Sequence, residues 1–360
     1  MKIFPCLTGL MLLSACNFSV DTNGDEPDSG SGGVRAETAA PSDPLHFADA
    51  KAGEANFTEP PVLRAQVILD RLGFSPGVID GEEGQSYGAA LRAFQKAESL
   101  DESGTLDQAT LEAMRPWRDV PATRLVTIPA AFAKGPFFPN LPAPAAEQAE
   151  LPALGYKNLM EALAERFHST PKALVALNSP NTKIGAGKVI RVPNIADVAP
   201  LAGADDRGWS ATLQKLGVAE KQPGAAKVVV DKSEGVLRAY DDKGDLIGQF
   251  PATMGSSRDP LPIGNWKIQG VSRNPDFHYD PKLFWDVSDD KKEQLLPPGP
   301  NGPVGVVWID LSKPHYGIHG TSAPHTIGRA ESHGCVRLTN WDAARLAQMV
   351  EPGVEVVFQE

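Results

Sequence analysis

The stretches Ile318-His319-Gly320-Thr321 and Ser332-His333-Gly334-Cys335-Val336-Arg337-Leu338 decide the fold and the chemistry expected of this chain. Runs of β-branched and aromatic residues at 304–311 and 316–319 predict strands that lead into the first stretch. Glycines at 320 and 334 predict turns, which would bring His319 and Cys335 face to face. A cysteine attacks as its thiolate, and a neighbouring imidazole is a usual means of generating one near neutral pH. The pattern therefore predicts a cysteine nucleophile with a histidine base.

This pair of motifs resembles the active-site signature of the L,D-transpeptidases, the peptidoglycan cross-linking family. In that signature, His-Gly-Thr is followed by Ser-His-Gly-Cys, a hydrophobic residue, Arg and then Asn, here Asn340. The resemblance implies that Cys335 is the nucleophile and that His319, rather than His333, exchanges protons with it. It also implies that a backbone carbonyl at Gly320 or Thr321 orients the His319 ring.

The remaining motif residues receive supporting roles from the same resemblance. Backbone N–H groups of Gly334 and Cys335 would form an oxyanion hole. Arg337 suits a substrate carboxylate, because its planar guanidinium pairs bidentately, although a structural salt bridge is an equal alternative. Ser332 and Asn340 would fix the loop by hydrogen bonds, and these two residues, with Thr321 and Arg337, make up the expected substrate-binding set.

The reaction implied is acyl transfer without a metal or cofactor. Cys335 would attack the stem tetrapeptide at diaminopimelate, release D-Ala and pass the acyl group to an amine. That amine would belong to a neighbouring diaminopimelate or to a lipoprotein lysine. One alternative is hydrolysis on the same fold, as in an L,D-carboxypeptidase or amidase. Another is a non-catalytic wall-binding lipoprotein, against which the intact cysteine and histidine pair argues.

Two structural interpretations of the histidine-rich segment were weighed against catalysis. A zinc site would use His319, His325, His333 and Cys335, but the spacing H-x5-H-x7-H-x-C matches none of the common zinc patterns. An inert core cysteine is also common in proteins. The polar, turn-like Ser-His-Gly context of Cys335 disfavours that interpretation.

The first residues predict export and lipid anchoring. Met1-Lys2 precedes a short apolar run, and small residues follow, as in a signal peptide spanning residues 1–15. Leu13-Ser14-Ala15-Cys16 resembles the bacterial lipobox, whose cysteine becomes the lipidated N-terminus. Of the three cysteines, Cys6 would leave with the signal peptide and Cys16 would be blocked, so Cys335 is the thiol expected in the mature chain. In known lipoprotein sorting signals, Asp after the lipidated cysteine favours retention in the inner membrane. Because Asn17 stands there instead, we expect an anchor in the outer membrane, with the protein facing the periplasm.

Composition predicts a tether and excludes some partners. Residues 16–60 are rich in Gly, Ser, Pro, Asp and Glu, which predicts a disordered tether. The net charge of −11 argues against nucleic acid and against an electrostatic anchor on anionic lipid.

The 360 residues are too many for one core, and they divide into three expected modules. Residues 61–118 resemble a three-helix peptidoglycan-binding domain, through Leu72-Gly73-Phe74, the Gly77-Val78-Ile79-Asp80-Gly81 turn and Ala93-Phe94-Gln95. Residues 119–154 read as a Pro- and Ala-rich linker.

Residues 155–198, with two short helices before a strand, resemble a glycan-binding lysin motif. A helical spacer is the alternative, and His168 is expected at a helix cap or on the surface.

Residues 226–360 hold the chemistry and read as mostly β, with one helix after Asn340. The whole is therefore expected to be a multidomain α+β protein.

Overall fold

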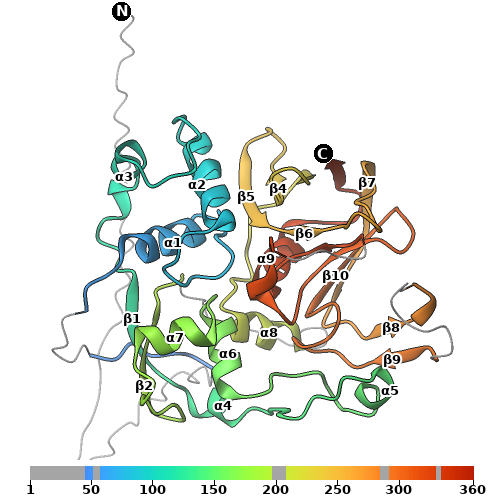
Figure 1. The fold of residues 1–360 in the computed structure, drawn as a ribbon, viewed down its shortest axis with the longest axis horizontal. Helices are drawn as coiled ribbons and strands as arrows, with labels where there is room; N and C mark the ends of the chain where they lie inside the picture. Colours follow the sequence, from blue (N-terminus) through green and yellow to red (C-terminus); the bar gives the residue numbers. More distant parts are fainter. Residues whose placement is uncertain (1–44, 52–56, 197–207, 284–291, 330–333) are drawn as a thin grey trace, which may run out of the picture. The chain divides into compact units, whose positions relative to one another are not determined.

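The residues from 226 onward form a mostly β unit in the computed structural model, which describes residues 45–51, 57–196, 208–283, 292–329 and 334–360 (Figure 1). A nine-stranded sheet, counted over these described residues, has the order β5-β4-β3-β13-β7-β10-β11-β12-β6. Its strands are β3 (Lys227–Asp231), β4 (Val236–Tyr240), β5 (Leu246–Pro251), β6 (Thr253–Met254), β7 (Gly264–Arg273), β10 (Val307–Leu311), β11 (Gly317–His319), β12 (Val336–Arg337) and β13 (Glu355–Gln359). The predicted strands are present, and the multidomain α+β class is confirmed.

Helix α9 (Asn340–Met349) packs against this sheet and follows the nucleophile motif directly. The Thr339 side chain accepts a hydrogen bond from the Asp342 backbone N–H, which caps the helix and fixes where it begins. Trp341 and Leu346 are fully buried in the main hydrophobic core, together with residues of α8 (Trp209–Leu216) and of the central strands. A short hairpin of β8 (Phe277–Tyr279) and β9 (Gln294–Leu296) lies outside the main sheet.

The first helical module contains α1 (Pro61–Arg71), α2 (Gln85–Ala97) and α3 (Gln108–Ala113), followed by the short 3-10 helix η1 (Arg115–Trp117). These are the three helices that the sequence predicts for residues 61–118. Their apolar faces share a core that includes Leu69, Leu91 and Phe94. The turn around Asp80 is held by the buried Gln66 side chain, which accepts hydrogen bonds from the Asp80 and Gly81 backbones at 3.1 and 2.7 Å.

The second module has a strand that the sequence analysis placed in a linker. Strand β1 (Thr123–Thr127) pairs antiparallel with β2 (Val189–Pro193), and α6 (Leu159–Arg166) and α7 (Pro171–Leu177) lie between them in sequence. The linker interpretation is therefore wrong at these residues. Because proline and alanine dominate the composition around residues 123–127, the sequence contains no clear signal for this five-residue strand. Two short helices, α4 (Ala130–Lys134) and α5 (Ala145–Gln148), also lie in the expected linker.

The expected tether ends earlier than predicted. Ala50 N–H donates to the Leu125 carbonyl at 2.9 Å, and Thr127 N–H donates to the Ala48 carbonyl at 2.9 Å, so residues 45–51 run alongside β1. Phe47 is 1% exposed and makes edge contacts with the Phe132 and Phe167 rings. Burial of this aromatic side chain and the backbone hydrogen bonds to β1 together hold the segment against the second module. Residues 1–44, with Cys16 and the expected signal peptide, lie outside the described residues.

Buried polar contacts join both helical modules to α9. The Arg345 guanidinium pairs bidentately with Asp70 of α1 at 2.8 and 2.9 Å. Ser75 Oγ donates to Asp342 at 2.7 Å. Burial would raise the pKa of Asp70, but Arg345 and His168 together hold it well below its usual range.

His168 is not at a cap or on the surface, as expected, but fully buried. Its Nδ1 lies 3.1 Å from Asp70 and its Nε2 lies 2.9 Å from the Leu216 carbonyl. Its ring stacks on Trp341 of α9, with centroids 5.1 Å apart. The sequence around His168 contains none of these partners, because all of them come from other modules.

In the described part of the chain, no helix is both long and apolar enough to cross a membrane.

Replacing Arg345 with methionine should destabilise the whole folded unit, because Asp70 then keeps a buried charge without its main partner. The expected loss is about 3–5 kcal/mol in the free energy of unfolding, measured in urea at pH 7. Arg115→Met, which removes an exposed pair with Glu112, should cost about 1 kcal/mol or less. Because the folded pKa of Asp70 is depressed, its contribution is present above its ordinary value of 3.8 and is lost as the pH falls below it. Equal losses for the two variants would contradict the buried pair.

Candidate functional site

Strand pairing brings the two sequence motifs together. Strand β11 pairs parallel with β12, with Ile318 opposite Val336 and His319 opposite Arg337. Side chains alternate between the two faces of a strand, so the fully buried Ile318 and Val336 lie on the core face. His319 and Arg337 lie on the other face, and Cys335 directly precedes β12. The register brings the two sequence motifs side by side, and the close approach of His319 and Cys335 themselves stays a prediction.

His319 is buried and oriented by its own turn. Its Nδ1 lies 2.7 Å from the Gly320 carbonyl oxygen, which can only accept, so Nδ1 carries the proton. The Nε2 atom is then the basic nitrogen of the neutral ring. The Trp308 ring stacks on the imidazole, with centroids 5.7 Å apart and planes inclined by 24°. The Gly320 carbonyl is one of the two orienting groups that the sequence resemblance implied.

Burial disfavours the charged forms of both His319 and Cys335. The pKa of His319 is lowered to about 4. Burial is the largest cause, the Gly320 hydrogen bond raises the value, and the charge of Arg337 lowers it. Burial raises the pKa of the Cys335 thiol, although a backbone hydrogen bond from Gly317 and the charge of Arg337 act in the opposite direction. At neutral pH the resting pair is therefore an imidazole and a thiol.

The backbone at the nucleophile has a conformation that favours glycine. Gly334 has φ of +98°, and the Tyr316 ring packs so closely that a Cβ on Gly334 would lie 2.7 Å from Cε1. The Cys335 Sγ lies 3.7 Å from the His315 carbonyl oxygen. A side chain at position 334 would therefore displace Tyr316 and the turn that presents Cys335.

The other expected substrate residues flank this pair. Arg337 is partly buried, and burial lowers the pKa of its guanidinium while Cys335 raises it. Thr321 is buried, and its hydroxyl accepts a hydrogen bond from Ala323 N–H at 3.2 Å. Ser332 and His333 lie outside the described residues. Among the described residues, no group of three or more His, Cys, Asp or Glu side chains is placed to hold a metal ion.

Asn340 lies below the site and is fully buried at the start of α9. Its Oδ1 accepts from Val306 N–H at 3.3 Å, and its Nδ2 lies 3.0 and 3.2 Å from the two Glu165 carboxyl oxygens. Asn340 thus connects the start of α9 to the segment before β10 and to α6, and its predicted role in fixing the active-site loop stays a prediction. Glu165 comes from the second helical module, 175 residues away in sequence. No pattern in the sequence indicates this contact.

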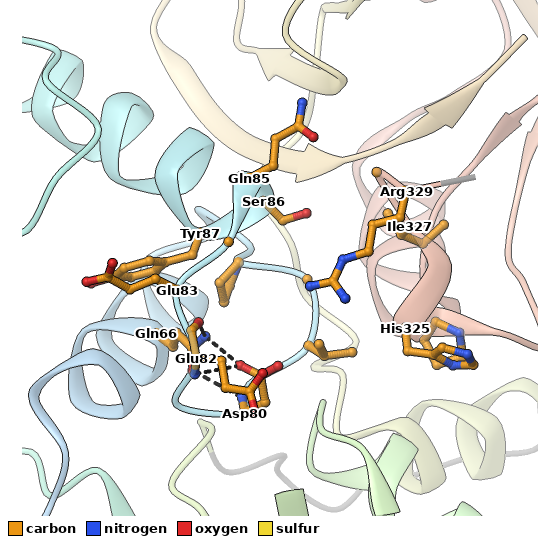
Figure 2. Close-up of a pocket in the computed structure, with 16 residues that line it drawn as sticks. Gln66, Asp80, Glu82, Glu83, Gln85, Ser86, Tyr87, His325, Ile327 and Arg329 are labelled. Atoms are coloured by element: carbon orange, nitrogen blue, oxygen red, sulfur yellow. Dashed lines mark hydrogen bonds between the residues drawn. The ribbon is translucent and has the colours of Figure 1, made fainter. Parts of the chain in front are cut away.

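A cavity lies between the first module and residues 324–329, which come between His319 and Cys335 in the sequence. Figure 2 shows its lining, with Asp80 and Glu82 on one side and His325 and Arg329 on the other. The segment approaches the start of α2 so closely that a Cβ on Gly84 would lie 3.6 Å from Arg329 Nη2. The cavity therefore carries acidic groups from one module and basic groups from the other.

The sequence analysis missed two aromatic residues that shape the site, Trp308 and Tyr316. Trp308 lies opposite His319 in the β10–β11 register. Strand alternation around residues 304–311 would have placed Trp308 on a known face, but the partner register is not readable from sequence. Tyr316 lies within the strand that the sequence predicts at 316–319, and only the fold shows that it contacts Gly334.

Two protein families match separate parts of the chain. Residues 225–358 match the L,D-transpeptidase catalytic domain, and residues 58–114 match a peptidoglycan-binding domain. A relative from Bacillus licheniformis, named as the L,D-transpeptidase YkuD, is 28% identical over 201 residues, which cover 55% of this chain and 91% of the relative. Its namesake in Bacillus subtilis is 53% identical over 59 residues, or 16% of this chain and 36% of the relative.

The L,D-transpeptidase YbiS of Escherichia coli is 30% identical over 135 residues, which cover 36% of this chain and 44% of the relative. The chain thus spans most of one of these relatives and less than half of the other two. L,D-transpeptidase 3 of Mycobacterium tuberculosis, solved with a faropenem-derived adduct, aligns at 18% identity over 66% of this chain and 91% of its own, with a TM-score of 0.32. The family matches confirm the expectation that this chain carries the catalytic domain of an L,D-transpeptidase enzyme.

Proposed function

Because residues 225–358 form an L,D-transpeptidase catalytic domain, we propose that this protein transfers acyl groups between peptidoglycan stem peptides through a thioester on Cys335. The observation that supports the proposal is the parallel β11–β12 register, which places the strand that follows Cys335 beside the strand that ends at the oriented His319. Residues 58–114, matched to a peptidoglycan-binding domain, support peptidoglycan as the substrate.

In the first half-reaction, Cys335 Sγ attacks the carbonyl carbon of the L-centre of diaminopimelate, and His319 Nε2 takes the thiol proton. Backbone N–H groups of Gly334 and Cys335 stabilise the oxyanion. The C–N bond to D-Ala then breaks, and His319 returns the proton to the leaving amine. The product is a thioester on Cys335 and a released D-Ala.

In the second half-reaction, an amine attacks the thioester carbonyl and gives its proton to His319, which restores the thiol as the C–S bond breaks. The acceptor is the side-chain amine of a neighbouring diaminopimelate or a lysine of a wall-linked lipoprotein. Arg337 and Thr321 border the nucleophile on the open side of the sheet. The Arg337 guanidinium suits a stem-peptide carboxylate, because such pairs form two parallel hydrogen bonds.

A carbapenem, as an acylating mimic of the donor stem, should add its mass once to the wild-type protein and not to Cys335→Ala. His319→Ala should be acylated about 10²–10⁴ times more slowly at pH 7, because a positioned base contributes about that factor. Mass spectrometry over time measures both. An adduct on Cys335→Ala would exclude Cys335 as the nucleophile, and an unchanged rate in His319→Ala would assign the base to His333.

The pH dependence of the same reaction follows from the depressed pKa of His319. A neutral base persists down to its folded pKa of about 4, so the wild-type rate should stay level between pH 7 and 5.5. The His319→Ala variant should recover partly above the ordinary thiol value of 9.0, where hydroxide supplies the thiolate.

The acceptor determines which wall product appears, and muropeptide analysis distinguishes the possibilities. Cells expressing the wild type should contain cross-links between two third-position residues that are missing with Cys335→Ala. A loss of lipoprotein linkage in the Cys335→Ala cells would identify a lysine acceptor instead. A change confined to the tetrapeptide-to-tripeptide ratio would identify water as the acceptor, and therefore a carboxypeptidase.

We further propose that the protein is anchored by lipid on Cys16 at the periplasmic face of the outer membrane and that its helical modules bind the wall. Strands β1 and β2 pair antiparallel, and α6 and α7 lie between them after α4 and α5, which supports a lysin-motif-like module whose first strand begins at residue 123. The cavity between Asp80 and Arg329 has groups that suit the ammonium and carboxylate ends of a stem peptide.

The variant Cys16→Ser should leave the membrane fraction and still pellet with purified sacculi, because anchoring and wall binding are separate functions. Sedimentation of the full-length variant with and without sacculi measures both. Retention in the membrane fraction would contradict the lipid anchor. Failure to pellet would leave the modules as supports of the catalytic domain.

A further inference from the structure

We propose that Glu165, in helix α6 of the second module, is a positioning residue for the catalytic base His319, acting through Asn340 and Gly320. The proposal rests on the function proposed above, in which His319 accepts the thiol proton. It gives a helical module, expected from sequence to bind glycan or to act as a spacer, a part in the chemistry. Four contacts connect the carboxyl group to the imidazole.

The first contact fixes the Asn340 amide. Its Oδ1 faces a backbone N–H, that of Val306, and its Nδ2 faces the Pro300 carbonyl at 3.2 Å. Because these backbone groups have unambiguous roles, the amide orientation is determined. The Nδ2 group therefore donates both to the Pro300 carbonyl and to the Glu165 carboxyl group, whose oxygens lie 3.0 and 3.2 Å away.

The second contact presses this amide against two glycines. A Cβ on Gly305 would lie 2.0 Å from Asn340 Oδ1, and a Cβ on Gly320 would lie 2.2 Å from the same atom. Neither position accepts a side chain while Asn340 stays in place. The amide is thus wedged between the backbone before β10 and the turn that follows His319.

The third contact joins the same turn to the sheet, and the fourth joins it to the base. Gly320 N–H donates to the Val304 carbonyl at 3.0 Å, which fixes the His319–Gly320 peptide, the one before the peptide that carries the Gly320 carbonyl. The Gly320 carbonyl then accepts from His319 Nδ1 at 2.7 Å. A shift of Asn340 would move the Gly320 peptide and, with it, the acceptor that keeps the proton on Nδ1.

The Glu165 carboxyl group is itself held in place by burial and by a hydrogen bond from Tyr156. It is 5% exposed, and Tyr156 donates its hydroxyl proton to Glu165 Oε2 at 2.9 Å. Burial raises the pKa of Glu165 to about 8, although hydrogen bonds from Tyr156 and Asn340 lower it. The carboxyl group is therefore largely uncharged at pH 7. Glutamine is then a close mimic, because its carbonyl accepts from Asn340 and its amide donates to the Tyr156 oxygen.

Ser75 provides a matched control. It also comes from a helical module and also makes a buried hydrogen bond to α9, at Asp342, two residues after Asn340. The Asp342 contacts run to Ser75, Thr339 and Arg345. Among the described residues, none of these three makes a hydrogen bond to the Gly320 turn. Ser75→Ala therefore removes a comparable buried bond without touching the route to His319.

The test compares carbapenem acylation rates in full-length Glu165→Ala, Glu165→Gln and Ser75→Ala, each below its unfolding temperature. Glu165→Ala should slow acylation about 10- to 100-fold, because small displacements of a catalytic group cost rates of this order. Glu165→Gln and Ser75→Ala should stay within about threefold of wild type, although Ser75→Ala loses stability. If Glu165→Ala does not fold, Glu165→Met, which fills the same space, replaces it.

A second measurement separates this proposal from the proposed function. The ¹⁵N shifts of the His319 ring, assigned by comparison with His319→Ala, should show the Nδ1-protonated form in the wild type, Glu165→Gln and Ser75→Ala. In Glu165→Ala they should show a mixture with the Nε2-protonated form. A wild type that no carbapenem acylates would refute the proposed function, while these shifts would still test the positioning. Wild-type shifts and rate in folded Glu165→Ala, or equal slowing in Ser75→Ala, would overturn the role of Glu165.

Discussion

Buried polar side chains need hydrogen-bonding partners. Helix α9 carries three such side chains, those of Asn340, Asp342 and Arg345. Each finds a main partner in an N-terminal module: Glu165, Ser75 and Asp70, respectively. Separating the modules from the catalytic unit would leave a buried charge and several buried donors without partners. The same helix begins five residues after Cys335, so the constraint that joins the modules also fixes the backbone that presents the nucleophile.

This arrangement gives the N-terminal modules two roles that use different surfaces. The buried faces of α1 and α6 support α9, while the turn around Asp80 and the start of α2 face the segment between His319 and Cys335. A wall-binding module in contact with that segment would bring a bound stem peptide close to the reacting sulfur. Holding a substrate next to the reacting groups converts an encounter between two molecules into a local step.

The sequence predicted the parts of the fold that depend on local patterns. Runs of β-branched and aromatic residues predicted the strands around 304–311 and 316–319, and the glycines at 320 and 334 predicted the turns next to His319 and Cys335. What it could not predict depends on partners far away in the chain. His168 looked like a helix cap, yet its partners Asp70, Leu216 and Trp341 come from three other helices or their ends. The local sequence does not distinguish a buried polar residue from an exposed one, because the partners that make burial possible are distant in the chain.

The uncharged resting state of the Cys335–His319 pair has a consequence for a thiol in an oxidising compartment, where the proposed lipid anchor would place it. Oxidation and disulfide exchange proceed through the thiolate, and their rates follow the fraction of thiolate present. Burial raises the pKa of Cys335 and lowers that of His319, so neither partner ionises the other at rest. In the mechanism proposed above, a donor carbonyl changes this balance, because negative charge would pass from the sulfur to an oxyanion near Gly334 while His319 takes the proton. The burial that slows damage to the thiol thus makes its reactivity depend on the presence of a substrate.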